Sequence, residues 1–132
     1  MRLTTIGTSC AALLALTTAV VAAPPSPNDR APRCFTTQFF NTWRAPDAYT
    51  MYIRVGTHDF YRLDMANRCS ALKGFDPRLI THWRGSNWVC NALDWDLKVS
   101  RSNGSPGEPC IVKAMTPLTK AEADAIPRKF RP

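Results

Sequence analysis

WVCNALDWDLKVS, residues 88–100, has the clearest hydrophobic period in this chain of 132 residues. Its apolar side chains fall at every second position with charged side chains between them: Leu93, Trp95, Leu97 and Val99 alternate with Asp94, Asp96 and Lys98. This alternation is typical of a half-buried β-strand. Cys90 lies near its start, and a loop rich in Ser, Gly and Pro follows it. The stretch is therefore predicted to be the central strand of a small sheet cross-linked by disulfides.

Residues 50–55 and 60–65 alternate in the same way, with apolar side chains at every second position. The loop between them, Gly56 to Asp59, has the length and the glycine of a hairpin connection. The two stretches are therefore predicted to form an antiparallel hairpin.

Three other segments have weaker strand signals. Residues 110–115 follow the loop after residue 100, and as the next element they are predicted to pair antiparallel with the 88–100 strand. Residues 79–84 are expected to form a short strand. Residues 34–43 combine aromatic side chains at helical spacing with threonines that suit a strand, so both structures remain open there.

The C-terminus has the strongest helix signal. Thr119 and Glu122 form a capping box, the residues that follow are rich in alanine, and Pro127 ends the pattern. The whole pattern predicts a mainly β fold, at the margin of α+β. We expect a small antiparallel open sheet or barrel of about five strands, with two disulfides and a short C-terminal helix.

The N-terminus has the three regions of a secretory signal peptide. Arg2 precedes an apolar run, and Val20 and Ala22 are the small residues that a signal peptidase prefers. The sequence thus predicts a signal peptide at residues 1–22, cleaved after Ala22. A disordered Pro-rich leader is expected at residues 23–33 and a single domain at residues 34–132.

Cleavage would remove Cys10 and leave four cysteines, an even number that predicts two disulfides in an exported protein. Zinc is disfavoured because no two cysteines have the close spacing of a ligand pair. Four cysteines allow three pairings. We favour Cys69 with Cys90, flanking the segment before the 88–100 strand, and Cys34 with Cys110, joining the start of the fold to the last strand.

The chain is basic, with a net charge of +7, which would become +6 after loss of Arg2. Arginines outnumber lysines, and such a balance favours contact with anionic surfaces. The expected partners are anionic envelope glycan or lipid, with no sequence-specific nucleic acid and no transmembrane segment after signal cleavage. A role in solubility alone explains the charge equally well, and the oligomeric state remains open.

Candidate catalytic groups are few. His82 and Ser86 suggest a small hydrolase, but Ser86 lacks the G-x-S-x-G turn that presents a nucleophile. Asp94 and Asp96 would be neighbours on one strand face, yet no calcium-loop sequence supplies the six to eight oxygens that calcium requires. No catalytic residue, cofactor or metal ligand is therefore assigned.

The segment HWRGSNW, residues 82–88, is the best candidate for binding. Exposed, Trp83 and Trp88 would stack on a sugar ring or base while Arg84 held a charged group. Buried, the tryptophans would belong to the core, which is the interpretation we favour for a small domain. Trp83, Arg84 and Trp88 are retained as the possible ligand-binding residues.

Four stretches are specific in combination: WRAPDAYTMYIRV, FYRLDMANRCSAL, RGSNWVCNALDWDLKV and PCIVKAMTPLTKAEADAIPRKFRP. Together they resemble a family of small exported proteobacterial proteins of unknown function, and the similarity covers Cys34 to Pro132. The resemblance implies bacterial export, to the periplasm or beyond, and a compact disulfide domain. It implies no activity and no site residue.

The expected function is that of a non-enzymatic structural or binding domain of the bacterial envelope, which meets anionic glycan or lipid through a basic and aromatic surface. Two alternatives stay open. One is a small periplasmic hydrolase that uses His82 and Ser86, and the other is a protein-binding module of the inhibitor type, which would present a large exposed apolar patch.

Overall fold

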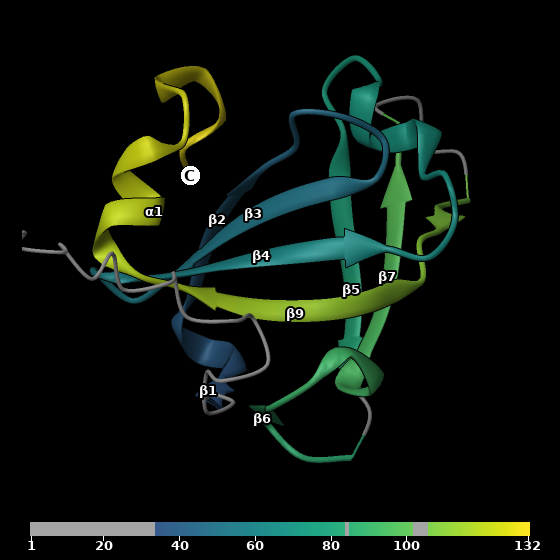
Figure 1. Ribbon diagram of the computed structural model, residues 1–132. Helices are drawn as coiled ribbons and strands as arrows, with labels where there is room; N and C mark the ends of the chain where they lie inside the picture. The colour runs from purple at the N-terminus through teal and green to yellow at the C-terminus, as the bar shows by residue number, and fades with distance from the viewer. Residues whose placement is uncertain (1–33, 84, 102–105) are drawn as a thin grey trace, which may run out of the picture.

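Figure 1 shows the computed structural model, which describes residues 34–83, 85–101 and 106–132. The predicted signal peptide and leader lie outside these residues. The described chain is mainly β, with three antiparallel sheets, one short C-terminal helix and two disulfides, and none of its sheets closes into a barrel. The predicted fold class is confirmed, as an open arrangement.

A four-stranded sheet forms the centre of the fold (Figure 1). Its order is β2-β3-β4-β9, and all neighbours are antiparallel. Its strands are β2 (Phe40–Arg44), β3 (Thr50–Val55), β4 (Asp59–Met65) and β9 (Val112–Leu118). The predicted hairpin is confirmed, with Val55 opposite Asp59 across the turn. Its inward residues are buried: Met51, Ile53, Val55, Tyr61, Leu63 and Met65.

A three-stranded sheet lies across one end of these strands, where Figure 1 shows β5 and β7. Its order is β5-β7-β8, with β5 at Arg78–Trp83, β7 at Trp95–Ser100 and β8 at Glu108–Pro109. A two-stranded ribbon pairs β1 (Phe35–Thr36) with β6 (Trp88–Val89). Between the sheets lies one hydrophobic core, to which all three contribute.

The 88–100 stretch is not one strand, which corrects the prediction. It divides into β6, a 3-10 turn η4 (Ala92–Asp94) and β7. The side chain of Asp94 accepts hydrogen bonds from the backbone N–H groups of Cys90, at 2.7 Å, and Asn91, at 3.0 Å. Such local bonds compete with a strand ladder. As a result Leu93 is 82% exposed, whereas Trp95, Leu97 and Val99 are buried as predicted.

The strand predicted at residues 110–115 pairs differently from the prediction. The short β8 takes the position beside β7, and the backbone N–H of Cys110 donates to the carbonyl of Leu97 at 2.9 Å. The chain then crosses to β4, so β9 pairs with β4 and not with β7. The edge of β4 would otherwise leave its backbone groups unpaired, and β9 satisfies them.

Residues 34–43 contain both kinds of structure left open by the sequence. The ribbon strand β1 runs into a 3-10 turn, η2 (Thr37–Phe39), which leads directly into β2. Phe35 and Trp43 therefore lie in strands, and the turn between these strands contains Thr37 and Phe39.

The two predicted disulfides are present, but their predicted pairing is wrong. The bridges join Cys34 with Cys90 and Cys69 with Cys110. In the β1–β6 ribbon, Phe35 lies opposite Val89, and this register brings the adjacent Cys34 and Cys90 together. Because a disulfide restricts the unfolded chain, each bridge contributes about 2–4 kcal/mol to stability.

The C-terminal helix α1 (Lys120–Ala125) begins at the predicted capping box. The hydroxyl of Thr119 accepts a hydrogen bond from the backbone N–H of Glu122, and the carboxylate of Glu122 accepts one from the backbone N–H of Thr119. Figure 1 shows α1 at the end of the four-stranded sheet remote from β5 and β7. It packs on β9, and Ala123 and Ile126 are buried outside the main core. None of the helices in the described part of the chain has the length and apolar character needed to cross a membrane.

Candidate functional site: a basic and aromatic pocket

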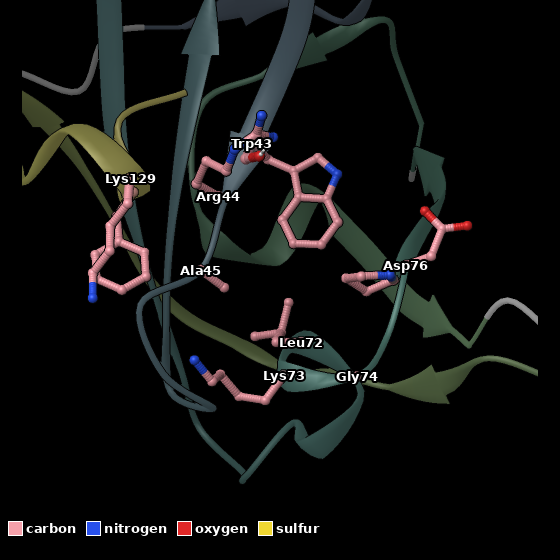
Figure 2. A pocket seen from close by; sticks show the side chains of 10 residues that line it. Trp43, Arg44, Ala45, Leu72, Lys73, Gly74, Asp76 and Lys129 are labelled. Carbon is pink, nitrogen blue, oxygen red and sulfur yellow. Dashed lines mark hydrogen bonds between the residues drawn. The ribbon is translucent and has the colours of Figure 1, made fainter.

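A pocket of about 400 Å³ lies where three distant segments meet (Figure 2). The segments are the end of β2, the 3-10 turn η3 (Ser70–Lys73) with the loop after it, and the 3-10 turn η5 (Arg128–Phe130). We call it the basic pocket, and it is lined by Trp43, Arg44, Ala45, Leu72, Lys73, Gly74, Asp76, Pro77, Lys129 and Phe130.

The end of β2 supplies an aromatic side chain and a cation. Trp43 is half-buried and packs against the hydrophobic core, and Figure 2 shows its indole ring along one wall of the pocket. Arg44 is exposed, and its guanidinium donates a hydrogen bond to the carbonyl of Trp43 at 2.9 Å. Adjacent residues of a strand point to opposite faces of the sheet. Trp43 and Arg44 can both line the pocket because the pocket lies at the end of β2.

The 3-10 turn η3 forms the floor and adds a second cation. Leu72 is buried there, while Lys73 is exposed. The ammonium of Lys73 donates to the carbonyl of Pro46 at 3.2 Å. This hydrogen bond holds the Lys73 ammonium at the rim of the pocket. Because an ammonium has three N–H donors, the others are left for a ligand.

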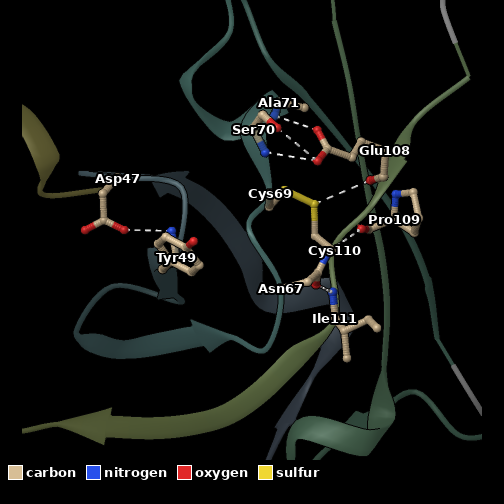
Figure 3. The surroundings of a disulfide bond; sticks show 10 residues. All are labelled: Asp47, Tyr49, Asn67, Cys69, Ser70, Ala71, Glu108, Pro109, Cys110 and Ile111. Atoms are coloured by element: carbon tan, nitrogen blue, oxygen red, sulfur yellow. Dashed lines mark hydrogen bonds between the residues drawn. A yellow bond between two sulfur atoms is a disulfide. The ribbon is translucent and has the colours of Figure 1, made fainter.

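The position of η3 is fixed by a cross-link and a carboxylate (Figure 3). The turn directly follows Cys69, which is bonded to Cys110. Glu108 accepts hydrogen bonds from the backbone N–H groups of Ser70 and Ala71, at 3.0 and 2.8 Å, and from the Ser70 hydroxyl at 3.3 Å. These are the unpaired N–H groups at the start of the turn, so Glu108 acts as its cap.

Those contacts also change the acidity of Glu108. Desolvation raises its pKa, but the hydrogen bonds from Ser70 and Ala71 and the attraction of Arg101 outweigh it, so the pKa is lowered below its ordinary value. Glu108 is therefore a carboxylate at neutral pH, as its capping role requires.

The C-terminal segment closes the pocket with a third cation and a second aromatic ring. The helix ends before Pro127, and the guanidinium of Arg131 folds back to donate to the carbonyls of Asp124 and Ile126. This clamp holds η5 in place. The Phe130 ring lies under two ammonium groups, that of Lys129 at 4.6 Å and that of Lys73 at 5.9 Å from its centroid.

The charge around the basic pocket is predominantly positive. Its lining has three cations, Arg44, Lys73 and Lys129, and one acid, Asp76. A guanidinium nitrogen of Arg78 lies 3.8 Å from the Asp76 carboxylate, in an exposed pair. Lysine and arginine side chains bind carboxylate, phosphate or sulfate groups, and aromatic rings stack on flat or apolar ligand faces. The arrangement can therefore hold an anionic ligand that also has an apolar face.

The predicted HWRGSNW site lies elsewhere and is described only in part. Trp88 is 56% exposed, so its interpretation as a core residue is wrong. The side chain of Trp83 and the whole of Arg84 lie outside the described residues, and their ligand-binding role stays a prediction. His82 is exposed on β5, and the hydroxyl of Ser86 is bonded to the backbone of Trp88.

The two candidate acids are not neighbours on one strand face. Asp94 lies in η4, where its carboxylate accepts hydrogen bonds from the backbone N–H groups of Cys90 and Asn91. Asp96 lies on β7 opposite His82. Among the described residues no group of three or more His, Cys, Asp or Glu side chains is placed to hold a metal.

A smaller hollow of about 220 Å³ lies between η4, β7 and the start of β9. Its lining is largely apolar, and it includes Leu93 and Ile111, both of which are exposed. The protein-binding alternative stays a prediction.

The basic pocket is not predicted by any pattern in the sequence. The aromatic spacing of residues 34–43 indicates only that Trp43 belongs to a helix or a strand. The basic residues around Phe130 indicate only a charged C-terminal tail. Lys73 had no distinguishing signal. A pocket formed by segments about 30 and 55 residues apart has no local pattern by which it could be found.

Comparison with known proteins places the chain in an uncharacterised group. Residues 1–131 match DUF6491, a family of unknown function. The chain belongs to this family. No curated protein and no solved structure matches it. The match agrees with the resemblance to an uncharacterised family, and the DUF6491 family brings no activity or site residue to compare with the basic pocket.

Proposed function

We propose that this member of the DUF6491 family is an exported, non-enzymatic domain of the bacterial envelope, which binds an anionic glycan or lipid through the basic pocket. The observation that carries the proposal is the convergence of Arg44, Lys73 and Lys129 with Trp43 and Phe130 around one hollow.

The electrostatics support an anionic ligand. Cations that line a concave surface with apolar walls concentrate the positive potential and attract anions. Both lysines are held in place. The Lys73 ammonium donates a hydrogen bond to the carbonyl of Pro46, and the Lys129 ammonium lies over the Phe130 ring. Side chains that are already ordered lose less conformational entropy when a ligand binds.

The covalent structure supports export. Two disulfides are consistent with an oxidising compartment, because thiols are kept reduced in the cytosol. The predicted signal peptide at residues 1–22 agrees with this address. We propose a periplasmic or extracellular location in a proteobacterium.

The hydrolase alternative gains no support from the described residues. The hydroxyl of Ser86 accepts from the N–H of Trp88 at 3.2 Å and donates to its carbonyl at 3.4 Å. A catalytic serine would instead donate to a base such as His82.

A binding assay tests the proposal. The oxidised protein, expressed from the full chain, would be sedimented with lipopolysaccharide, with peptidoglycan and with vesicles of anionic phospholipid, each at low and high salt. We expect binding to at least one of them, weakened by salt because the contact is electrostatic. Absence of binding to all three at low salt would overturn the proposal.

A pair of charge variants makes the assay specific for the pocket. Lys73→Gln with Lys129→Gln removes two pocket cations. Lys98→Gln with Lys113→Gln removes two cations that do not line the pocket, so the net charge is the same. Equal weakening by both pairs would show a diffuse charge effect and no role for the basic pocket.

A further inference from the structure

We infer that the ligand of the basic pocket is a sugar residue with an anionic group, whose ring stacks on Trp43 while its carboxylate or phosphate faces Lys73 and Lys129. This inference rests on the proposed function, since it names the ligand class of the same site.

The form of the site favours a discrete ring over a membrane surface. The site is a hollow of about 400 Å³, within the range that holds small molecules, whereas a bilayer presents a broad surface that does not enter a hollow of this size. The stacking wall is an indole, the side chain with the largest flat face. Trp43 packs against the core, so its ring is held in place where it lines the pocket.

The rest of the lining matches the two sides of an acidic sugar. Ala45, Leu72 and Pro77 are apolar and can contact the C–H groups of a pyranose ring. The indole Nε1–H of Trp43 donates to no described residue, and a sugar hydroxyl can accept from it. The ammonium groups of Lys73 and Lys129 both lie near the Phe130 ring. Figure 2 shows Lys129 on the side of the pocket opposite Asp76. An anionic substituent on the ring would therefore be directed away from Asp76 and toward the ammonium groups.

One exposed residue separates this inference from the lipid alternative. Phe75 is 90% exposed on the loop between Gly74 and Asp76, which both line the pocket. A protein that bound a lipid headgroup here would insert Phe75 among the acyl chains. A sugar held inside the pocket makes no demand on Phe75. The two ligands thus depend on different aromatic side chains.

Calorimetric titration tests the inference with two acidic sugars and their neutral counterparts. The probes are a galacturonic acid trimer against its methyl ester, and glucose 1-phosphate against glucose. The full chain with oxidised disulfides is used. We expect at least one acidic probe to bind at least tenfold more tightly than its neutral counterpart, since one charge-assisted contact is worth about that factor.

Variants assign the binding to its residues. Trp43→Ala should weaken binding about tenfold, and Trp43→Phe less, because a smaller ring stacks more weakly and has no N–H donor. Trp43→Phe keeps a ring against the core, so its result stands even where Trp43→Ala fails to fold. Phe75→Ala should leave sugar binding unchanged.

The outcomes separate the two levels of the proposal. The inference is overturned when neither acidic probe binds at millimolar concentration, when neutral probes bind equally well, or when Trp43→Phe has no effect. Binding to vesicles of phosphatidylglycerol that is lost in Phe75→Ala, without sugar binding, would overturn the inference and keep the proposed function. Binding neither to the sugars nor to any envelope component would overturn both.

Discussion

The carboxylate of Glu108 accepts a hydrogen bond of 2.8 Å from the backbone N–H of Ala71, 37 positions earlier in the chain. The same carboxylate accepts hydrogen bonds from the backbone N–H and the hydroxyl of Ser70. It therefore caps the turn η3, whose last residue, Lys73, reaches the basic pocket. Together with the adjacent bridge between Cys69 and Cys110, this cap couples the stability of the domain to the geometry of its candidate site.

Glu108→Gln is expected to destabilise the domain by about 1–2 kcal/mol. The variant replaces a charged acceptor of three hydrogen bonds with an amide that has one acceptor oxygen, and the loss is moderated because the site is partly exposed. Urea denaturation measures the change. Asp96→Asn removes the same charge from β7 and should cost less than about 0.5 kcal/mol. Equal effects of the two variants would show that charge alone, and not capping, is responsible.

The capping role also predicts a pH dependence. The pKa of Glu108 is lowered in the folded state, so its contribution to stability is present above its ordinary value of 4.5 and is lost as the pH falls through the folded pKa. The free energy of unfolding of the wild type and of Glu108→Gln should therefore converge as the pH falls below about 4.5. Asp124, whose pKa is lowered by Lys120, acts in the same direction in both proteins and cancels in this difference. A constant gap from pH 7 to pH 3 would contradict the assignment.

Arg131→Ala is expected to weaken binding at the basic pocket by about three- to tenfold, with a loss of stability of about 1 kcal/mol. Its guanidinium holds η5 by bonds to the carbonyls of Asp124 and Ile126, and without them Lys129 and Phe130 lose their fixed position. Arg128→Ala removes the same charge from an exposed residue that does not line the pocket. Calorimetric titration of the two variants should separate them, and identical affinities would show that the clamp does not position the site.

Leu97 and Leu93 test the corrected boundary of the central strand. Leu97 is buried on β7, so Leu97→Ala should cost about 2–5 kcal/mol. Leu93 is exposed in η4, so Leu93→Ala should change stability by less than about 0.5 kcal/mol. Thermal denaturation of both variants measures the difference. A large cost at Leu93 would support the uninterrupted strand that the alternation predicts.

The sequence predicts the elements whose signal is local. The hairpin of β3 and β4 follows from alternation around a glycine turn, and the helix start follows from the Thr119 and Glu122 capping box. The alternation of apolar and polar residues gives a wrong prediction at residues 91–94. It does not show that the side chains of Asn91 and Asp94 accept hydrogen bonds from nearby backbone N–H groups, which form a turn there.

Long-range pairing is where the prediction fails, for a physical reason. The partner of each cysteine depends on which strands lie side by side. The paired strands β1 and β6, and likewise β4 and β9, are about 50 residues apart in the sequence. The basic pocket depends on the same pairing. Trp43, Lys73 and Lys129 meet only after the sheet, the bridge at Cys69 and the Arg131 clamp have formed.

A nuclear magnetic resonance titration tests the central claim most directly. The ¹⁵N-labelled protein would be titrated with the anionic ligand that binds in the assays above, and amide and indole shifts followed residue by residue. We predict that the largest shifts fall at the Trp43 indole N–H, at residues 72–77 and at residues 129–130, and that they vanish in Lys73→Gln with Lys129→Gln. Shifts centred instead on Trp88 and residues 82–88, with none at Trp43, would contradict the account and place the site at the turn before β6.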